Sequence, residues 1–428
     1  MAKALGYKIK DIITEEIDKG DELFNSVCEK LGIQETEIEI KDLVRIRDVL
    51  YDDIESIYGR EIAEIVDYSI KKYELVEEMN GVKGRGIDQL KKRYDILMEL
   101  GDISITLGET GRAIDNYQKA VDIVEELQRK ELLVDAVDGL SHAYLHRGAL
   151  NEALNTVNRG KRIAKEIDYE EGLAKMLRDE GLIKWHLGDF EDSLELMNEA
   201  VEIFDNKMMK NESAGLYKNL GDILAEMEEF GESIKYYKKS SDIYESIDKE
   251  YESINVLMNI GVIFSLQDEW KKAAEYYEKS QRISNEYKFP NSQAWALFNL
   301  GESYLNLGEY EAAEKVLLES IELFEEQEDP YGEAGVKMKY GQLMKEKDDL
   351  ETAEGYLEDS VRILRGLHIS EDLGEAIYEL GQIKNKLGKV EEAVELLEEA
   401  VQIYDSLDME VKKGDTEEKI NILTKSLK

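Results

Sequence analysis

The sequence predicts an all-α protein in which antiparallel helix pairs stack into a solenoid. Glycine recurs every 40 residues, with Ser141 in the one slot where it is missing; the glycines are Gly101, Gly181, Gly221, Gly261, Gly301, Gly341 and Gly381. A repeat of this length cannot bury its apolar face alone, so neighbouring copies must stack. The chain has only 2 prolines in 428 residues, which favours long uninterrupted helices.

Small residues recur at fixed places in each copy. A second glycine often follows seven residues later, where a left-handed turn would end the first helix. A small residue stands twelve residues after the first glycine, where the two helices are expected to cross, and another stands nineteen after it. Pro290 and Pro330 lie eleven residues before Gly301 and Gly341. Each should begin a helix, because the N–H that proline lacks would be unpaired in a first turn.

This frame resembles the tetratricopeptide repeat. The resemblance is carried by Leu300, Gly301, Tyr304, Gly308, Tyr310 and Ala313, by Leu380, Gly381, Gly388 and Ala393, and by Leu220, Gly221, Phe230 and Tyr237. The long period is similar to that of kinesin light chain and the Pins-like spindle adaptors. The resemblance implies a right-handed superhelix of eight repeats over residues 87–414, whose concave groove binds an extended peptide or protein segment.

Residues 1–86 lack the repeat and indicate a module of three amphipathic helices. Its apolar stripes are Ile9, Ile12, Ile13, Ile17, Phe24, Val27 and Leu31; Leu43, Val44, Leu50, Ile54 and Ile57; and Ile62, Ile65, Val66, Ile70, Tyr73 and Val76. The segment 80–86, NGVKGRG, is interpreted as a glycine hinge. It lacks the Gly-Lys-Ser/Thr of a phosphate-binding loop. A DNA-binding helix-turn-helix in residues 20–58 fits by length, but the acidity of that segment disfavours it.

At the other end, a capping helix is predicted over residues 415–428. Asp415 and Thr416 are suited to cap its first turn. Ile420, Ile422 and Leu423 would form its apolar side, which an array needs to cover the open face of its last repeat.

The net charge of −41 argues against a nucleic-acid partner, because phosphate backbones are bound by clustered Lys and Arg. The acidic residues are spread over the array, which favours a role in solubility over attraction of a basic partner. A single cysteine, Cys28, and the absence of a signal-peptide pattern predict a cytoplasmic protein. The uncharged run at residues 254–267 is too short to cross a membrane, and burial in the fifth repeat would explain it.

An asparagine row is the main functional signal. Asn219, Asn259 and Asn299 each stand two residues before the glycine of repeats four to six, on the predicted groove. In the related long-repeat adaptors such asparagines bond the backbone of an extended peptide, and the resemblance implies that role here. An amide both donates and accepts, so it pairs with a peptide whatever the side chains of that peptide. A solvated position or a bond between adjacent repeats is the alternative.

Apolar and basic side chains flank this row. The candidate apolar anchors are Trp185, Met258, Trp295 and Phe298. Aromatic residues in a groove are typical binding hot spots, although each of these can instead fill the core between helices. The candidate bases for acidic groups of a partner are Lys175, Arg178 and Lys218.

Three histidines form a candidate metal site. His142 and His146 are one helical turn apart, and His186 takes the slot of His146 in the next repeat. Polar lining of the groove is the preferred interpretation, because equivalent residues of adjacent repeats lie too far apart for shared ligation. The sequence contains no nucleophile elbow, Walker loop, dinucleotide fingerprint or CxxC pair, so neither a catalytic residue nor a cofactor is expected.

The sequence therefore predicts a non-enzymatic adaptor whose groove binds a protein or peptide partner. The alternative is a ligand-responsive regulator that resembles the Rap-type proteins in architecture, in which groove occupancy repositions the N-terminal helices. A third interpretation is self-association through the N-terminal helices or the ends of the array.

Overall fold

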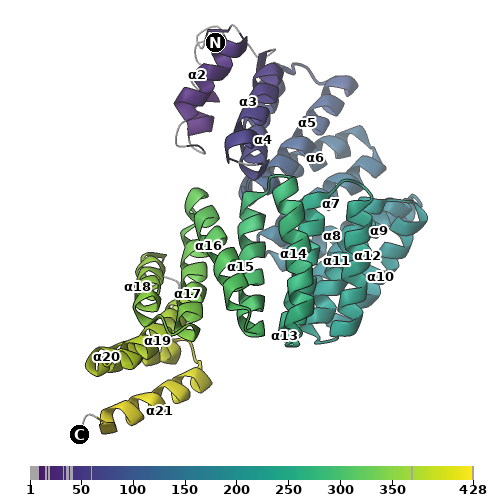
Figure 1. Cartoon of the computed structure of the whole chain (residues 1–428). Helices are drawn as coiled ribbons and strands as arrows, with labels where there is room; N and C mark the ends of the chain where they lie inside the picture. Colours follow the sequence, from purple (N-terminus) through teal and green to yellow (C-terminus); the bar gives the residue numbers. More distant parts are fainter. Residues whose placement is uncertain are drawn as a thin grey trace. The chain divides into compact units, whose positions relative to one another are not determined.

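The computed structural model describes residues 9–14, 17, 20–31, 33–34, 38, 42–58, 60–367 and 370–426. Their regular structure is helical throughout, as predicted (Figure 1). Contacts divide the chain into two compact units, Met1–Val256 and Leu257–Lys428, and each is described by itself. This division does not coincide with the boundary predicted after residue 86.

After the helical residues 9–14, the first unit holds three further helices followed by helix pairs. The three are α2 (Gly20–Leu31), α3 (Leu43–Tyr58) and α4 (Arg60–Gly81). The pairs are α5 (Ile87–Thr106) with α6 (Thr110–Leu127), α7 (Lys130–His146) with α8 (Leu150–Glu166), α9 (Glu170–His186) with α10 (Phe190–Asn206), and α11 (Lys210–Glu226) with α12 (Phe230–Glu245). Helix α13 (Glu250–Leu266) runs across the division.

The second unit continues the same alternation (Figure 1). Its helices are α14 (Trp270–Glu286), α15 (Pro290–Leu307), α16 (Tyr310–Glu326), α17 (Pro330–Glu346), α18 (Leu350–Leu367), α19 (Ser370–Lys386), α20 (Val390–Ser406) and α21 (Glu410–Ser426). Pro290 and Pro330 are the first residues of α15 and α17, which confirms their predicted place.

The predicted apolar stripes form a core in the N-terminal part of the first unit. Ile9, Ile13, Phe24, Leu50 and Ile70 are among its buried members. Two stripe residues were predicted wrongly, because Val44 and Val76 are exposed. The side chain of Ile57 lies outside the described ones. Residues 82–86, within the predicted hinge, are not helical.

The repeated glycine permits close helix packing. A Cβ on Gly221 would lie 2.6 Å from the ring of Tyr237, sixteen residues later. Ser141 fits in the second repeat because Val157, a smaller residue, takes the place of that ring. Tight spacing of the two helices in each pair therefore depends on a small residue facing a large one.

The helix ends repeat as regularly as the glycines. The second glycine has positive φ at Gly108, Gly148, Gly188, Gly308 and Gly388, as predicted for a left-handed turn. Glu228, Asp268 and Asp348 adopt the same turn without glycine. The second helix of a pair also ends in a left-handed residue, which the sequence did not predict. This position is occupied by Gln128, Asp168, Met208, Asp248, Lys288, Glu328 and Asp408.

The C-terminal helix begins earlier than predicted. Helix α21 starts at Glu410, so Asp415 and Thr416 lie inside it, and the Thr416 hydroxyl donates to the carbonyl of Lys412 at 2.7 Å. Ile420 and Leu423 are half-buried, but Ile422 is exposed and does not belong to the apolar side. Lys428, the predicted end, lies outside the described residues.

Candidate binding groove

One face of the first helices is left half-open. Six positions per repeat define this groove face: six, three and two residues before the repeat glycine, and one, four and five after it. In α15 they are Trp295, Phe298, Asn299, Glu302, Leu305 and Asn306, and all are half-buried or exposed. Of the intervening residues, Ala296, Leu297, Leu300, Gly301 and Ser303 are buried and Tyr304 is half-buried. Consecutive first helices contact one another in both units, as α5–α7–α9 and as α15–α17–α19.

Charges on the groove face pair between neighbouring repeats. In the first unit the Lys175 ammonium lies 3.1 Å from Asp135, and Arg178 lies 2.8 Å from Asp138. In the second unit Lys345 lies 2.7 Å from Glu379. The groove face thus neutralises much of its own charge.

The bases proposed for a partner's carboxylates are therefore already engaged. Lys175 and Arg178 are held by the pairs above, and Lys218 donates to Asp222 at 2.6 Å. The sequence contained a signal for the first two pairs, because Asp135 and Lys175 are 40 residues apart and so occupy the same slot of consecutive repeats. Asp138 and Arg178 share this relation.

A buried polar cluster joins α7 to α9. Asp179 is completely buried and accepts from the Ser141 hydroxyl and from Arg178 Nε, the latter at 2.9 Å. Arg178 also donates to Asp138 at 2.8 Å, so one guanidinium serves two carboxylates. Burial raises the pKa of Asp138. Burial and the positive charge of Arg178 lower the pKa of His142 to about 4.

The tryptophans predicted as anchors already make contacts within the protein. Trp185 donates its indole N–H to Glu226 at 2.9 Å. Trp295 packs edge to face against Phe324, with ring centroids 5.1 Å apart, and against Phe298 at 5.7 Å. Trp295 therefore belongs in part to the inter-helix core, the alternative considered for it, while Phe298 and Met258 are half-buried.

The asparagines fall on both sides of the division. Asn219 lies in the first unit, and Asn259 and Asn299 lie in the second; all three are half-buried. Within the described residues the side-chain amides of Asn219 and Asn299 make no hydrogen bond, although neighbouring charged side chains are paired. Those two amides can accept and donate to an incoming backbone.

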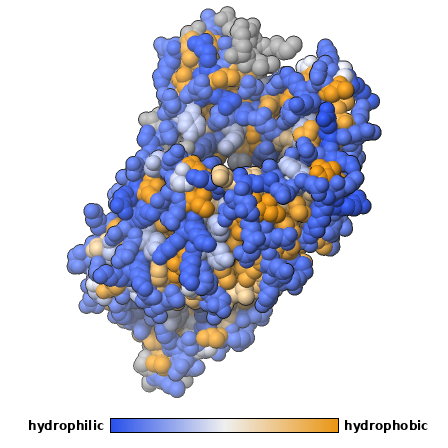
Figure 2. Space-filling view, turned by 90° about the vertical axis from the view of Figure 1, so that its right-hand side faces the viewer, coloured by the Kyte–Doolittle hydropathy of each residue, from blue (hydrophilic) through white to orange (hydrophobic). Residues whose placement is uncertain are grey.

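The groove face of α13 differs from the others because it is uncharged. In the second unit it presents Met258, Asn259, Val262 and Leu266. As the sequence predicted, burial explains most of the apolar residues in the uncharged run at residues 254–267, namely Ile254, Val256, Leu257, Ile260, Ile263 and Phe264. Val262 and Leu266 are the exceptions, because they are 43% and 65% exposed. On the face that Figure 2 shows, hydrophilic residues predominate and hydrophobic residues lie in patches among them.

The histidines do not form a metal centre in the described residues. The rings of His142 and His146 pack edge to face with centroids 4.6 Å apart, while His186 stacks on Trp185. No group of three metal-ligating side chains gathers anywhere in the part of the chain that the structure describes. No described helix is long and apolar enough to cross a membrane.

Comparison with known families decides the classification. One tetratricopeptide repeat model matches residues 172–246, 212–286 and 252–326, and a second matches residues 94–124 and 374–406. These matches together cover just over half of the chain. The chain belongs to the tetratricopeptide repeat family. Its repeats are of a type that forms protein-interaction scaffolds. No curated protein matches this tetratricopeptide repeat protein.

Solved structures share the fold of this tetratricopeptide repeat protein at low sequence identity. The apo form of RapI is 13% identical with a TM-score of 0.58, and the alignment covers 79% of this chain and 98% of RapI. A signal transduction ATPase with a tetratricopeptide repeat sensor, from Pyrococcus horikoshii, is 13% identical with a TM-score of 0.54. That alignment covers 87% of this chain and 67% of the ATPase.

Proposed function

We propose that this protein is a non-enzymatic scaffold that binds an extended, weakly charged peptide or protein segment on the groove face of α13 and α15. The observation that carries the proposal is the uncharged groove face of α13, with Val262 and Leu266 exposed in a chain of net charge −41. Exposed apolar side chains gathered on one face are typical of interaction sites. Burying a Val or Leu side chain contributes about 1.5–3 kcal/mol.

Helix α15 extends this uncharged surface. Glu302 is the one charged residue among its six groove positions, and Lys339 lies 2.7 Å from it. Helices α13 and α15 are the first helices of consecutive repeats, and their groove residues Met258 to Leu266 and Trp295 to Asn306 lie within the second unit. A partner segment on α13 and α15 therefore needs apolar side chains and free backbone groups more than charge.

The asparagines supply the polar part of the proposed site. Asn259 and Asn299 lie on these two helices, and each hydrogen bond to a peptide backbone contributes about 0.5–1.5 kcal/mol. They would orient the segment while the apolar side chains provide most of the affinity. Asn219, in the first unit, is tested separately because its participation is an independent question.

The experiment selects random twelve-residue peptides on the wild-type protein and measures the affinity of a selected peptide by fluorescence anisotropy. The double variant Val262→Asp with Leu266→Asp is expected to weaken binding by about 30-fold or more, because it removes two apolar contacts. The double variant Asn259→Ala with Asn299→Ala is expected to weaken it by about tenfold. Asn219→Ala shows whether the fourth repeat contributes.

Met208→Asp is the matched control. Met208 is apolar and 85% exposed, lies outside the groove face, and has positive φ, a conformation that Asp tolerates. This variant exchanges an exposed apolar side chain for Asp, as each half of the double variant does, without touching the proposed site, so it should bind the peptide normally. Equal binding by the Val262 and Leu266 double variant and by this control would show that the peptide binds elsewhere.

A second candidate is a ligand-responsive regulator, and the junction between α4 and the first repeat supports it. Lys92 of α5 lies 2.7 Å from Glu78 of α4, and Lys71 of α4 pairs with Glu99 of α5. These surface pairs are individually weak, so a modest binding energy is enough to separate them. Hydrogen exchange of α4 and residues 82–86, with and without a selected peptide, distinguishes the candidates: only a regulator changes there.

A further inference from the structure

We propose that a cavity between α4 and the start of the first repeat binds a small organic carboxylate with an apolar body. This site is separate from the groove face and lies wholly within the first unit. The cavity has a volume of about 650 Å³. Pockets for small molecules typically measure about 300–1,000 Å³.

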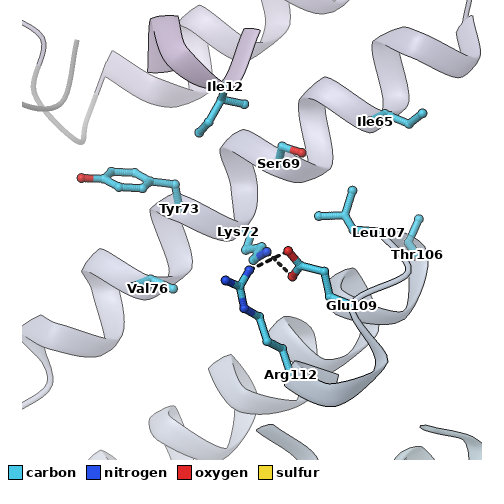
Figure 3. A pocket seen from close by; sticks show the side chains of 10 residues that line it. All are labelled: Ile12, Ile65, Ser69, Lys72, Tyr73, Val76, Thr106, Leu107, Glu109 and Arg112. Atoms are coloured by element: carbon cyan, nitrogen blue, oxygen red, sulfur yellow. Dashed lines mark hydrogen bonds and ion pairs between the residues drawn. The ribbon is translucent and has the colours of Figure 1, made fainter. Parts of the chain in front are cut away.

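Four aliphatic side chains form the apolar part of the cavity wall. Ile12 enters from the N-terminal segment, Ile65 and Val76 come from α4, and Leu107 comes from the turn after α5 (Figure 3). These side chains come from three separate parts of the chain and surround the polar groups described next. They would hold the hydrocarbon part of a ligand away from water.

The polar groups of the cavity carry a net positive charge. Lys72 of α4 and Arg112 of α6 both bind the carboxylate of Glu109, and Arg112 Nη1 donates to it at 2.6 Å (Figure 3). Lys72, Arg112 and Glu109 are the charged residues that line the cavity, so two cations share one carboxylate. A local excess of positive charge in a chain of net charge −41 favours an anionic ligand there.

Unused donors remain beside Glu109. The Arg112 guanidinium has five N–H groups and meets Glu109 through Nη1. Lys72 has three, and its one carboxylate partner within the described residues is Glu109. The hydroxyl of Ser69, drawn at the cavity wall in Figure 3, makes no hydrogen bond within the described residues. A second carboxylate can therefore bind without displacing Glu109.

Charge and shape together define the ligand class. A carboxylate matches the geometry of a guanidinium and the charge of the ammonium. A hydrocarbon tail fits the four apolar side chains. A highly charged phosphate compound would leave those side chains facing polar groups, so a monocarboxylate with an aliphatic body is the best match.

The test titrates the full-length protein with octanoate and with octan-1-ol by isothermal titration calorimetry. Octanoate is expected to bind with a Kd below about 1 mM, and octan-1-ol at least about tenfold more weakly, because only the acid engages the two cations. Arg112→Ala is expected to weaken octanoate binding by about tenfold while leaving octan-1-ol unchanged. Arg112 is 68% exposed, so this variant should retain the fold.

Glu109→Gln provides the sharper test. It removes the negative charge of Glu109, which repels a ligand carboxylate bound to the remaining donors of Lys72 and Arg112, so octanoate should bind about threefold to tenfold more tightly. A purely structural role for Glu109 predicts the opposite change. Arg362→Ala is the matched control, because Arg362 is 70% exposed and pairs with Asp359 in the same three-residue spacing as Arg112 with Glu109. It should leave binding unaltered.

Three results would overturn the proposal. They are the absence of octanoate binding up to 10 mM in a series that also includes butanoate and dodecanoate, equal affinities for octanoate and octan-1-ol, and weakened octanoate binding by Glu109→Gln. Circular dichroism of each variant checks that the helices are retained. A failure here leaves the peptide site on α13 and α15 untouched, because neither ligand nor variants involve that face.

Discussion

The serine in the glycine slot of the second repeat is explained by the residues around it. The Ser141 hydroxyl donates to the buried carboxylate of Asp179, and Val157 leaves room for its Cβ. Ser141→Gly is therefore expected to lower stability by about 2 kcal/mol, although it restores the repeat pattern, because it removes a hydrogen bond to a buried charge and adds a helical glycine. The midpoint of urea unfolding measures this change.

Ser141→Ala separates the two contributions. It keeps the Cβ and the helix propensity but removes the hydroxyl, so its urea midpoint should fall between those of wild type and Ser141→Gly. A Ser141→Gly protein as stable as wild type would mean that Arg178 alone satisfies Asp179.

His142 makes stability depend on pH. Its pKa in the folded protein is about 4, below the value of 6.5 for a free histidine, mainly because of burial, with Arg178 and His146 adding repulsion. Between these two values the unfolded chain binds the proton more readily, so this contribution is lost as pH falls from about 6.5 towards 4. The loss attributable to His142 between pH 7 and pH 5 is about 2 kcal/mol.

The variant His142→Gln isolates that contribution. Asp138 acts in the opposite direction, because its raised pKa lets the folded protein take up a proton first. The measured quantity is therefore the difference in urea-unfolding free energy between wild type and His142→Gln at pH 7 and at pH 5. From pH 7 to pH 5 the unfolding free energy of wild type should fall relative to that of His142→Gln. An equal difference at both pH values would contradict a buried, neutral histidine.

At the scale of helices, glycines of two kinds should respond oppositely to alanine. A Cβ on Gly221 would lie 2.6 Å from the ring of Tyr237, so Gly221→Ala is expected to destabilise by about 1–3 kcal/mol. Gly355 is exposed within α18, with no atom within 4 Å of an added Cβ, so Gly355→Ala should stabilise by about 0.5–1 kcal/mol. Thermal unfolding by circular dichroism of both variants checks the contrast, which equal shifts would refute.

The 40-residue frame predicted the helices well because each end depends on short-range rules. Proline in the first turn and glycine in the left-handed turn place α15 at Pro290 and its end at Gly308. The same frame also points to Glu410, eleven residues before the next expected slot at position 421, as the start of α21. The local capping residues Asp415 and Thr416 suggested a later start, so the repeat register was the better guide.

The candidate site was less predictable because it depends on contacts between helices. The repeat register assigns Lys175 and Arg178 to the groove face, but their engagement by Asp135 and Asp138 follows from how α7 and α9 pack. Val262 and Leu266 were missed for a related reason. An uncharged run in the sequence predicts burial, but it does not tell which face of the helix other helices cover. These two side chains lie on the open face.

At the scale of the whole molecule, excess acid remains after the pairs are formed. The chain has 96 acidic and 55 basic residues, so even if every base paired with one acid, the net charge of −41 would remain. Self-repulsion of such a surface destabilises the folded chain. It should be strongest at low salt, since the screening length is about 30 Å at 0.01 M salt and about 8 Å at 0.15 M.

Salt should therefore stabilise this protein. Screening also weakens the surface ion pairs, but each exposed pair contributes only about 0–1 kcal/mol, so loss of repulsion dominates. Raising NaCl from 10 to 150 mM is expected to raise the thermal midpoint by about 2–4 °C. Choline chloride at equal ionic strength should act alike if screening is the cause, whereas a rise with sodium alone would indicate cation binding. A falling midpoint would show that the ion pairs between repeats outweigh the repulsion.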